Sequence, residues 1–128
     1  MTTPAQTFAD ALQTLEGSGD VASFVSSVFT SDAVLLRPET GQELTGTDGA
    51  RQYWEQYLAQ FGEIRSEFSQ VRDADGLGVL EWTSTGTLAG GGDISYTGVS
   101  LLDLDGEGRV TRFATYFDTA KFSAPPTV

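Results

Sequence analysis

The spacing of apolar residues divides the chain into a helical first half and an extended second half. A hydroxyl at Thr3 followed by Pro4 predicts the start of a helix, and Gly17 is expected to end it. The apolar residues of this segment recur at intervals of three and four: Phe8, Ala11, Leu12 and Leu15. We therefore expect a first helix that packs on a core through one face.

The same periodicity predicts two more helices. Asp20 is positioned to cap a short second helix, which is expected to fade near Thr30–Asp32. Its apolar positions are Val21, Phe24, Val25 and Val28. Thr47 is expected to open a third helix and Gly62 to end it. The apolar face of that helix is largely aromatic and consists of Ala50, Tyr53, Trp54, Tyr57, Leu58 and Phe61.

After the third helix the apolar period changes from 3.6 to 2, which predicts strands. Short glycine-bearing turns separate four extended segments, expected at 63–73, 77–88, 93–105 and 109–118. A small hairpin is predicted earlier, at 33–37 and 42–45. The fold class is therefore α+β, with three N-terminal helices packed on an antiparallel sheet. We expect a single domain over 1–128, with its core at about 5–122 and a loose tail at 123–128.

Alternation along the last three strands separates two faces of the sheet. One parity carries no charge and is expected to face the helices, with Phe68 joining it. It consists of Leu80, Trp82, Ser84, Gly86, Leu88, Ile94, Tyr96, Gly98, Ser100, Leu102, Leu104, Thr111, Phe113, Thr115 and Phe117. The other parity holds the ionic residues and is expected to face outward. A homodimer through this outer face is predicted from four apolar residues on it, Val99, Leu101, Ala114 and Tyr116.

Composition excludes several functions. The formal net charge of -11 has the wrong sign for binding nucleic acid or an anionic membrane. The chain has no Cys and no His, which excludes thiol nucleophiles, Ser-His-Asp triads and the usual zinc sites. The Asp pairs at 73/75 and 103/105 lack calcium-loop spacing, so we expect no metal and no cofactor. No membrane span and no signal peptide is recognisable, so the expected location is cytoplasmic.

The residues also resemble a known family. The pattern comprises three helices and then strands carrying Glu81-Trp82-Thr83, a glycine hairpin at 105–110 and the closing Tyr116-Phe117-Asp118. It resembles the nuclear transport factor 2-like superfamily, and most closely its SnoaL-like, polyketide cyclase-like branch, over about residues 5 to 122. The resemblance implies a cone-shaped half-barrel with a curved sheet. Its concave face, covered by the helices, would hold a small-molecule pocket, and a dimer would be common.

The resemblance also implies where catalytic residues would fall. The positions used by the limonene epoxide hydrolases hold Trp82, Ser84 and Thr115 here, and the acid of the polyketide cyclases falls near Thr115. The two carboxylates of the ketosteroid isomerases fall on Arg37 and Ser100. None of these five residues is an acid. The sequence therefore predicts that the usual catalytic carboxylates of the family are missing.

The leading hypothesis is a protein that binds a small apolar, aromatic or polycyclic molecule. The expected ligand contacts are Arg37, Trp54, Tyr57, Trp82, Ser84, Tyr96, Ser100, Phe113, Thr115 and Phe117. The same spacings also fit ordinary core aromatics and a solvated arginine.

Two alternatives stay open. One is a cyclase-, isomerase- or epoxide hydrolase-like enzyme in which Tyr96 donates a hydrogen bond to a carbonyl, with help from Ser84 or Thr115. The other is a structural or partner-binding dimer with a filled core. A cavity of roughly 300 Å³ or more would favour a binder or an enzyme over a filled core.

Overall fold

The computed structural model describes residues 2–122 and begins with helix α1, Pro4–Ser18. The hydroxyl of Thr3 accepts a hydrogen bond from the backbone N–H of Gln6 at 3.2 Å, which confirms the predicted cap. The helix continues through Gly17 and ends at Gly19, so the expected end at Gly17 is wrong. Gly19 ends it because its backbone is left-handed (φ 74°) and its N–H returns to the last turn.

Helix α2 is Val21–Val28, and the side chain of Asp20 caps it as predicted. Strand β1, Phe29–Arg37, follows without a loop. The second helix therefore ends before Thr30–Asp32, where it was expected to fade. Phe29 is drawn into the sheet by pairing with Val110, a contact between residues far apart in sequence that local periodicity cannot signal.

Strand β2, Gln42–Thr45, pairs antiparallel with β1 and confirms the predicted hairpin. Helix α3, Gly46–Ala59, comes next. It ends before Phe61, which was expected on the helix and instead begins strand β3. The ring of Phe61 is buried in either case and packs against Tyr57, with ring centroids 5.4 Å apart. Because Phe61 is apolar in both conformations, its hydrophobicity does not mark the boundary.

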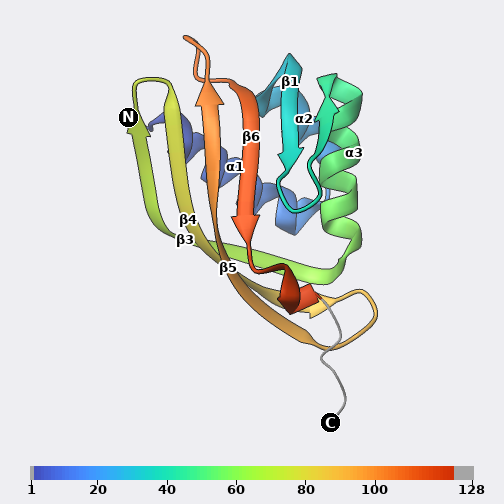
Figure 1. The fold of residues 1–128 in the computed structure, drawn as a ribbon. Helices are drawn as coiled ribbons and strands as arrows, with labels where there is room; N and C mark the ends of the chain where they lie inside the picture. The colour runs from blue at the N-terminus through green and yellow to red at the C-terminus, as the bar shows by residue number, and fades with distance from the viewer. Residues whose placement is uncertain (1, 123–128) are drawn as a thin grey trace.

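One sheet of six strands runs in the order β2-β1-β6-β5-β4-β3 (Figure 1). The predicted antiparallel meander is confirmed and consists of β3 (Phe61–Ala74), β4 (Leu77–Leu88), β5 (Asp93–Leu104) and β6 (Val110–Phe117). Strand β1 pairs with β6 in parallel, so the sheet is mixed and not wholly antiparallel as expected. A short 3₁₀ helix, η1 (Thr119–Phe122), follows β6. The expected tail at 123–128 lies outside the described residues.

The three helices cover one face of the sheet, as predicted. Helix α1 packs on β3 and β4, and α3 packs on β1, while the long strands β3 to β5 curve beneath them (Figure 1). Each inner-face pair of β4 and β5 sets a large residue against a small one: Gly78–Leu102, Leu80–Ser100, Trp82–Gly98, Ser84–Tyr96 and Gly86–Ile94. A Cβ added at Gly98 would collide with the Trp82 indole, so the missing side chain gives the indole its place over β5.

The parity prediction is confirmed on β4 and β5, where the buried residues are those expected to face the helices. On β6 the opposite parity also contributes two buried residues, Val110 at 1 % and Ala114 at 0 % exposed. Ala114 is small and is flanked by its larger cross-strand partners Leu36 and Leu101, and Val110 pairs with Phe29 and Leu104. Because Ala114 is fully buried within the monomer, the prediction that it contacts a second copy is wrong. Val99 and Leu101 are half-buried on the outer face, and Tyr116 is 46 % exposed there.

The densest packing lies beside α2 and β1. Five rings there are each at most 5 % exposed, and nine pairs of them have ring centroids 5.0 to 6.4 Å apart. We call this group the aromatic core: Phe8, Phe24, Phe29, Trp54 and Phe113. Within residues 2–122, no helix has the length and apolar character needed to cross a membrane.

Candidate functional site

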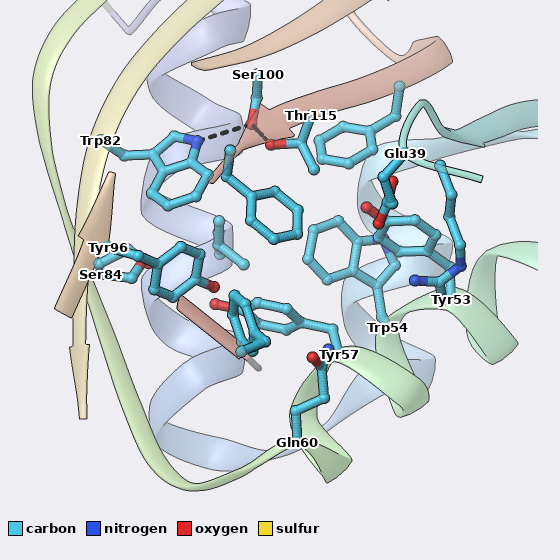
Figure 2. A pocket seen from close by; sticks show the side chains of 16 residues that line it. Glu39, Tyr53, Trp54, Tyr57, Gln60, Trp82, Ser84, Tyr96, Ser100 and Thr115 are labelled. Carbon is cyan, nitrogen blue, oxygen red and sulfur yellow. Dashed lines mark hydrogen bonds between the residues drawn. The ribbon is translucent and has the colours of Figure 1, made fainter. Parts of the chain in front are cut away.

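A cavity lies between the helices and the concave face of the sheet (Figure 2). Sixteen side chains line it: Leu12, Arg37, Glu39, Tyr53, Trp54, Tyr57, Gln60, Ser66, Trp82, Ser84, Tyr96, Ser100, Phe113, Thr115, Phe117 and Phe122. The space inside it that the centre of a water molecule can reach is about 50 Å³. This is room for a few waters and less than the roughly 300 Å³ expected for a drug-sized ligand.

All ten residues predicted as ligand contacts line this one cavity. Six further lining residues are not among these predicted ligand contacts: Leu12, Glu39, Tyr53, Gln60, Ser66 and Phe122. Tyr53 and Leu12 lie on helix faces that were predicted to be buried, so the signal for them was present. Ser66 lies two residues before Phe68 in the regularly paired stretch 63–68 of β3, so the parity that placed Phe68 on the inner face was a signal for it as well. Phe122 follows the last strand, where no periodic pattern applies.

Eight of the sixteen residues that line the cavity are aromatic. Trp82 and Tyr96 meet edge to face with centroids 5.2 Å apart, and Phe122 packs on Tyr96 at 4.8 Å. On the helical side, Trp54 contacts Tyr57 at 5.3 Å. Rings of this kind offer large apolar contact area at little cost in conformational entropy. The walls therefore suit a flat, apolar ligand surface.

Two hydroxyls fix the orientation of Trp82. Its Nε1 donates to Ser100 Oγ at 2.9 Å, and Ser100 Oγ lies 2.9 Å from Thr115 Oγ1 (Figure 2). Because Ser100 accepts from the indole, its own proton is free for Thr115. These polar groups satisfy one another, so they stabilise the wall rather than offering an open binding group.

One acidic residue reaches the cavity wall from a helix and not from the sheet. Glu16, in the last turn of α1, accepts hydrogen bonds from the Tyr57 hydroxyl at 2.6 Å, the Ser66 hydroxyl at 2.6 Å and the Ser66 backbone N–H at 2.8 Å. Ser66 Oγ lies 2.6 Å from Ser84 Oγ. The hydroxyl of Tyr96 points toward that of Tyr57 (Figure 2), and Ser84 is its other polar neighbour. We call these five residues the hydroxyl network.

The three tyrosines that line the cavity are held in the protonated form. Burial, and after it the charge of Glu16, raises the pKa of Tyr57 and of Tyr96 above the ordinary value of 10.0. Burial also raises the pKa of Tyr53. At neutral pH these phenols donate or accept hydrogen bonds and do not act as bases.

Charged residues lie at the β1–β2 side of the cavity. The Arg37 guanidinium lies 4.6 Å from the centre of the Tyr53 ring and donates to Gln56 Oε1 at 2.6 Å. Arg37 is half-buried and Glu39 is exposed. The predicted ligand contact at Arg37 is therefore a rim residue already engaged with an aromatic face and an amide.

Trp54 carries the one fully buried side-chain polar atom of the cavity lining that has no hydrogen-bond partner within residues 2–122. Its Nε1–H is buried and has no hydrogen-bond partner among the described residues. Leaving such a donor unpaired costs about 1–3 kcal/mol. Over the same residues, no group of three or more metal-ligating side chains is placed to hold a metal ion. The site thus offers apolar walls, neutral hydroxyls and one free donor.

Comparison with known proteins places this architecture in a class. Three solved structures with the nuclear transport factor 2-like fold or a close relative of it illustrate the likeness. One, from Anabaena variabilis, is a nuclear transport factor 2-like protein with 17% identity, TM-score 0.79, and coverage of 94% of this chain and 91% of that chain. Another is a putative SnoaL-like polyketide cyclase from Jannaschia. It has 18% identity and a TM-score of 0.75, and the match covers 98% of this chain and 99% of that chain. The third, from Catenulispora acidiphila, has a ketosteroid isomerase-like fold and is in complex with trimethylamine. It has 17% identity and a TM-score of 0.78, and the match covers 94% of this chain and 91% of that chain.

At these identities the likeness shows the fold alone. The sequence itself gives the family: the SnoaL-like domain matches residues 5–113, and the chain belongs to that family. The resemblance found from the sequence is therefore confirmed. No curated protein matches the chain.

Proposed function

We propose that this protein binds a small, largely apolar aromatic molecule in the cavity and does not transform it. The observation that carries the proposal is the lining: eight of the sixteen residues are aromatic, and a few hydroxyls gather at one end. Small-molecule sites typically combine apolar walls with a few placed polar groups. A structural relative in complex with a small amine, trimethylamine, is compatible with this proposal.

The free space of about 50 Å³ limits the ligand unless the cavity opens. Phe122 is the side chain best placed to make room. It is half-buried, sits on the four-residue helix η1, and contacts Tyr96 and also Phe61, at 5.9 Å. Moving it disturbs no strand pairing, because η1 lies outside the sheet. A single ring is therefore the natural ligand size, and a polycyclic ligand requires Phe122 to move.

Binding without turnover is favoured by the kind of groups in the wall. Tyr96 stays protonated, because burial raises its pKa, so it is not a general base. The carboxylates nearby are Glu39, exposed at the rim, and Glu16, which already accepts three hydrogen bonds. The second candidate is a cyclase-, isomerase- or epoxide hydrolase-like enzyme that uses Tyr96 as a donor. The position of the Tyr96 hydroxyl in the cavity favours it (Figure 2).

Calorimetric titration with phenol, which has one ring, and 2-naphthol, which has two, tests the proposal. We expect saturable binding of phenol to the wild-type protein and tighter binding of 2-naphthol to Phe122→Ala than to the wild type. Phe68→Ala is the matched control, because Phe68 is a half-buried phenylalanine that does not line the cavity. Absence of binding of both probes, to wild type and to Phe122→Ala at millimolar concentration, would contradict the proposal and favour a filled core. Turnover of epoxide, enone or polyketide-like substrates that is lost in Tyr96→Phe would favour the enzyme.

We also propose that two copies associate through the outer face of the sheet. Tyr116 is exposed there, beside half-buried Val99 and Leu101, and an apolar patch on an antiparallel sheet is stabilised when it is covered. The net charge of -11 opposes association, so pairing should strengthen as salt screens the repulsion. Sedimentation at low and high salt tests this, and a monomer at high concentration in both would contradict it.

A further inference from the structure

The hydroxyl network commits its protons in one direction. A hydroxyl has one proton to donate, and a carboxylate has none. Tyr57 and Ser66 therefore both donate to Glu16. Because the proton of Ser66 is used there, the 2.6 Å contact between Ser66 and Ser84 carries the proton of Ser84 toward Ser66. Each proton points toward Glu16, and the remaining lone pairs of each oxygen point away from it.

Tyr96 lies at the outer end of this arrangement. Its hydroxyl points toward that of Tyr57, and its other polar neighbour is Ser84; the protons of both are already committed. Neither neighbour can donate to Tyr96, whereas the Tyr57 oxygen has a lone pair that can accept its proton. With the Tyr96 proton turned to Tyr57, the group that the network leaves for the cavity is an oxygen lone pair. This reverses the role considered from the sequence, in which Tyr96 donates to a ligand carbonyl.

We infer that Glu16 makes this end of the cavity a hydrogen-bond acceptor, so that the ligand is an aromatic ring with a free hydroxyl. The O–H of such a phenol donates to the oxygen of Tyr57 or Tyr96 while its ring lies among the aromatic walls. The inference rests on the proposed function and specifies its ligand class. A neutral donor is preferred to an ammonium group, because burying a charge costs far more than burying a hydroxyl and the Glu16 carboxylate already accepts three hydrogen bonds.

Glu16→Gln should invert this polarity without changing the shape of the side chain. The backbone N–H of Ser66 donates to one carboxylate oxygen of Glu16, so a glutamine must keep its carbonyl oxygen there. Its NH₂ group then takes the place of the other oxygen, facing the hydroxyls of Tyr57 and Ser66. The NH₂ group donates to the hydroxyl oxygens of Tyr57 and Ser66, so the protons of these two hydroxyls turn away from residue 16. The cavity end becomes a donor and should favour a carbonyl ligand.

Calorimetric titration with four single-ring probes tests this polarity: phenol, anisole, benzaldehyde and benzylamine. For the wild-type protein we expect phenol to bind about 3- to 10-fold more tightly than anisole or benzaldehyde, the range for one net hydrogen bond. For Glu16→Gln we expect benzaldehyde to bind more tightly than phenol. Glu67→Gln is the matched control, because Glu67 is an exposed carboxylate adjacent to Ser66 that does not line the cavity. It should keep the wild-type order.

The outcomes separate the inference from the proposed function. Wild-type binding in which anisole, benzaldehyde or benzylamine equals or exceeds phenol overturns the inference and leaves the proposed function standing. An unchanged preference for phenol in folded Glu16→Gln overturns the assignment to Glu16. If circular dichroism shows that Glu16→Gln does not fold, Tyr57→Phe decides, since it removes one acceptor oxygen and should reduce the advantage of phenol over anisole. Failure of every probe to bind, in wild type and in Phe122→Ala, contradicts the proposed function and the inference with it.

Discussion

The aromatic core and the hydroxyl network are neighbouring parts of the interior that are held together by different interactions. The aromatic core consists of nearly inaccessible rings in edge, tilted and stacked contacts, which tolerate small shifts in geometry. The hydroxyl network consists of contacts of 2.6 to 2.8 Å that fix where each proton points. The difference indicates that the first region sets the stability of the fold, whereas the second sets which ligand the cavity accepts.

Phe113→Ala should produce the largest effect, because Phe113 belongs to the aromatic core and also lines the cavity. Truncating a buried phenylalanine costs about 3–5 kcal/mol of unfolding free energy, a large share of the roughly 5–15 kcal/mol typical of a domain. Urea unfolding followed by circular dichroism measures it. A loss below about 1 kcal/mol would contradict the view that the aromatic core dominates stability.

Alkaline pH should lower stability through the cavity tyrosines. Burial raises the pKa values of Tyr53, Tyr57 and Tyr96 above 10.0 in the folded protein. Their contribution is fully present below pH 10 and is lost as pH rises, because the unfolded chain ionises first. Each tyrosine then removes about 1.4 kcal/mol per pH unit. Unfolding free energies at increasing pH should fall less steeply for Tyr57→Phe than for wild type, with Tyr116→Phe as the matched control. Equal slopes for Tyr57→Phe and wild type would contradict the prediction.

Ser84→Ala should have the smallest effect on stability and a visible effect on the network. It removes the donor to Ser66 Oγ and changes little volume, so we expect a loss of about 1 kcal/mol. The hydroxyl of Tyr96 also loses one of its two neighbours. Urea unfolding gives the free energy, and calorimetry with phenol gives the change in affinity. A loss as large as that of Phe113→Ala would show that the two regions do not divide stability and specificity as described.

Local patterns were enough to predict the framework of the fold. The 3.6-residue and two-residue periods located the helices and the long strands, and strand parity identified Trp82, Ser84, Tyr96 and Ser100 as cavity residues. Two of the errors arose where a distant contact decided the structure. The parallel pairing of β1 with β6 starts a strand at Phe29 and buries Ala114, and neither residue carries a local signal of it.

Glu16 shows a different reason for a missed residue. It lies four residues after Leu12 and seven after Ala9, so helical spacing places it on the buried face of α1. The signal was therefore present, but an acidic residue in the last turn of a helix suggests a solvated position. Its role depends on Tyr57 and Ser66, from two other elements, which converge on it only in the folded chain.

The most direct test of ligand binding in the cavity uses the two tryptophans. The chain has only 2 Trp, and both Trp54 and Trp82 line the cavity. Their indole N–H groups differ, since that of Trp82 donates to Ser100 and that of Trp54 has no partner among the described residues. In NMR spectra recorded during titration with phenol, we predict that both indole N–H signals shift and saturate together, while the backbone amide signal of Tyr116 on the outer face stays in place. Indole signals that stay in place at saturating phenol while the Tyr116 amide moves would contradict binding in the cavity.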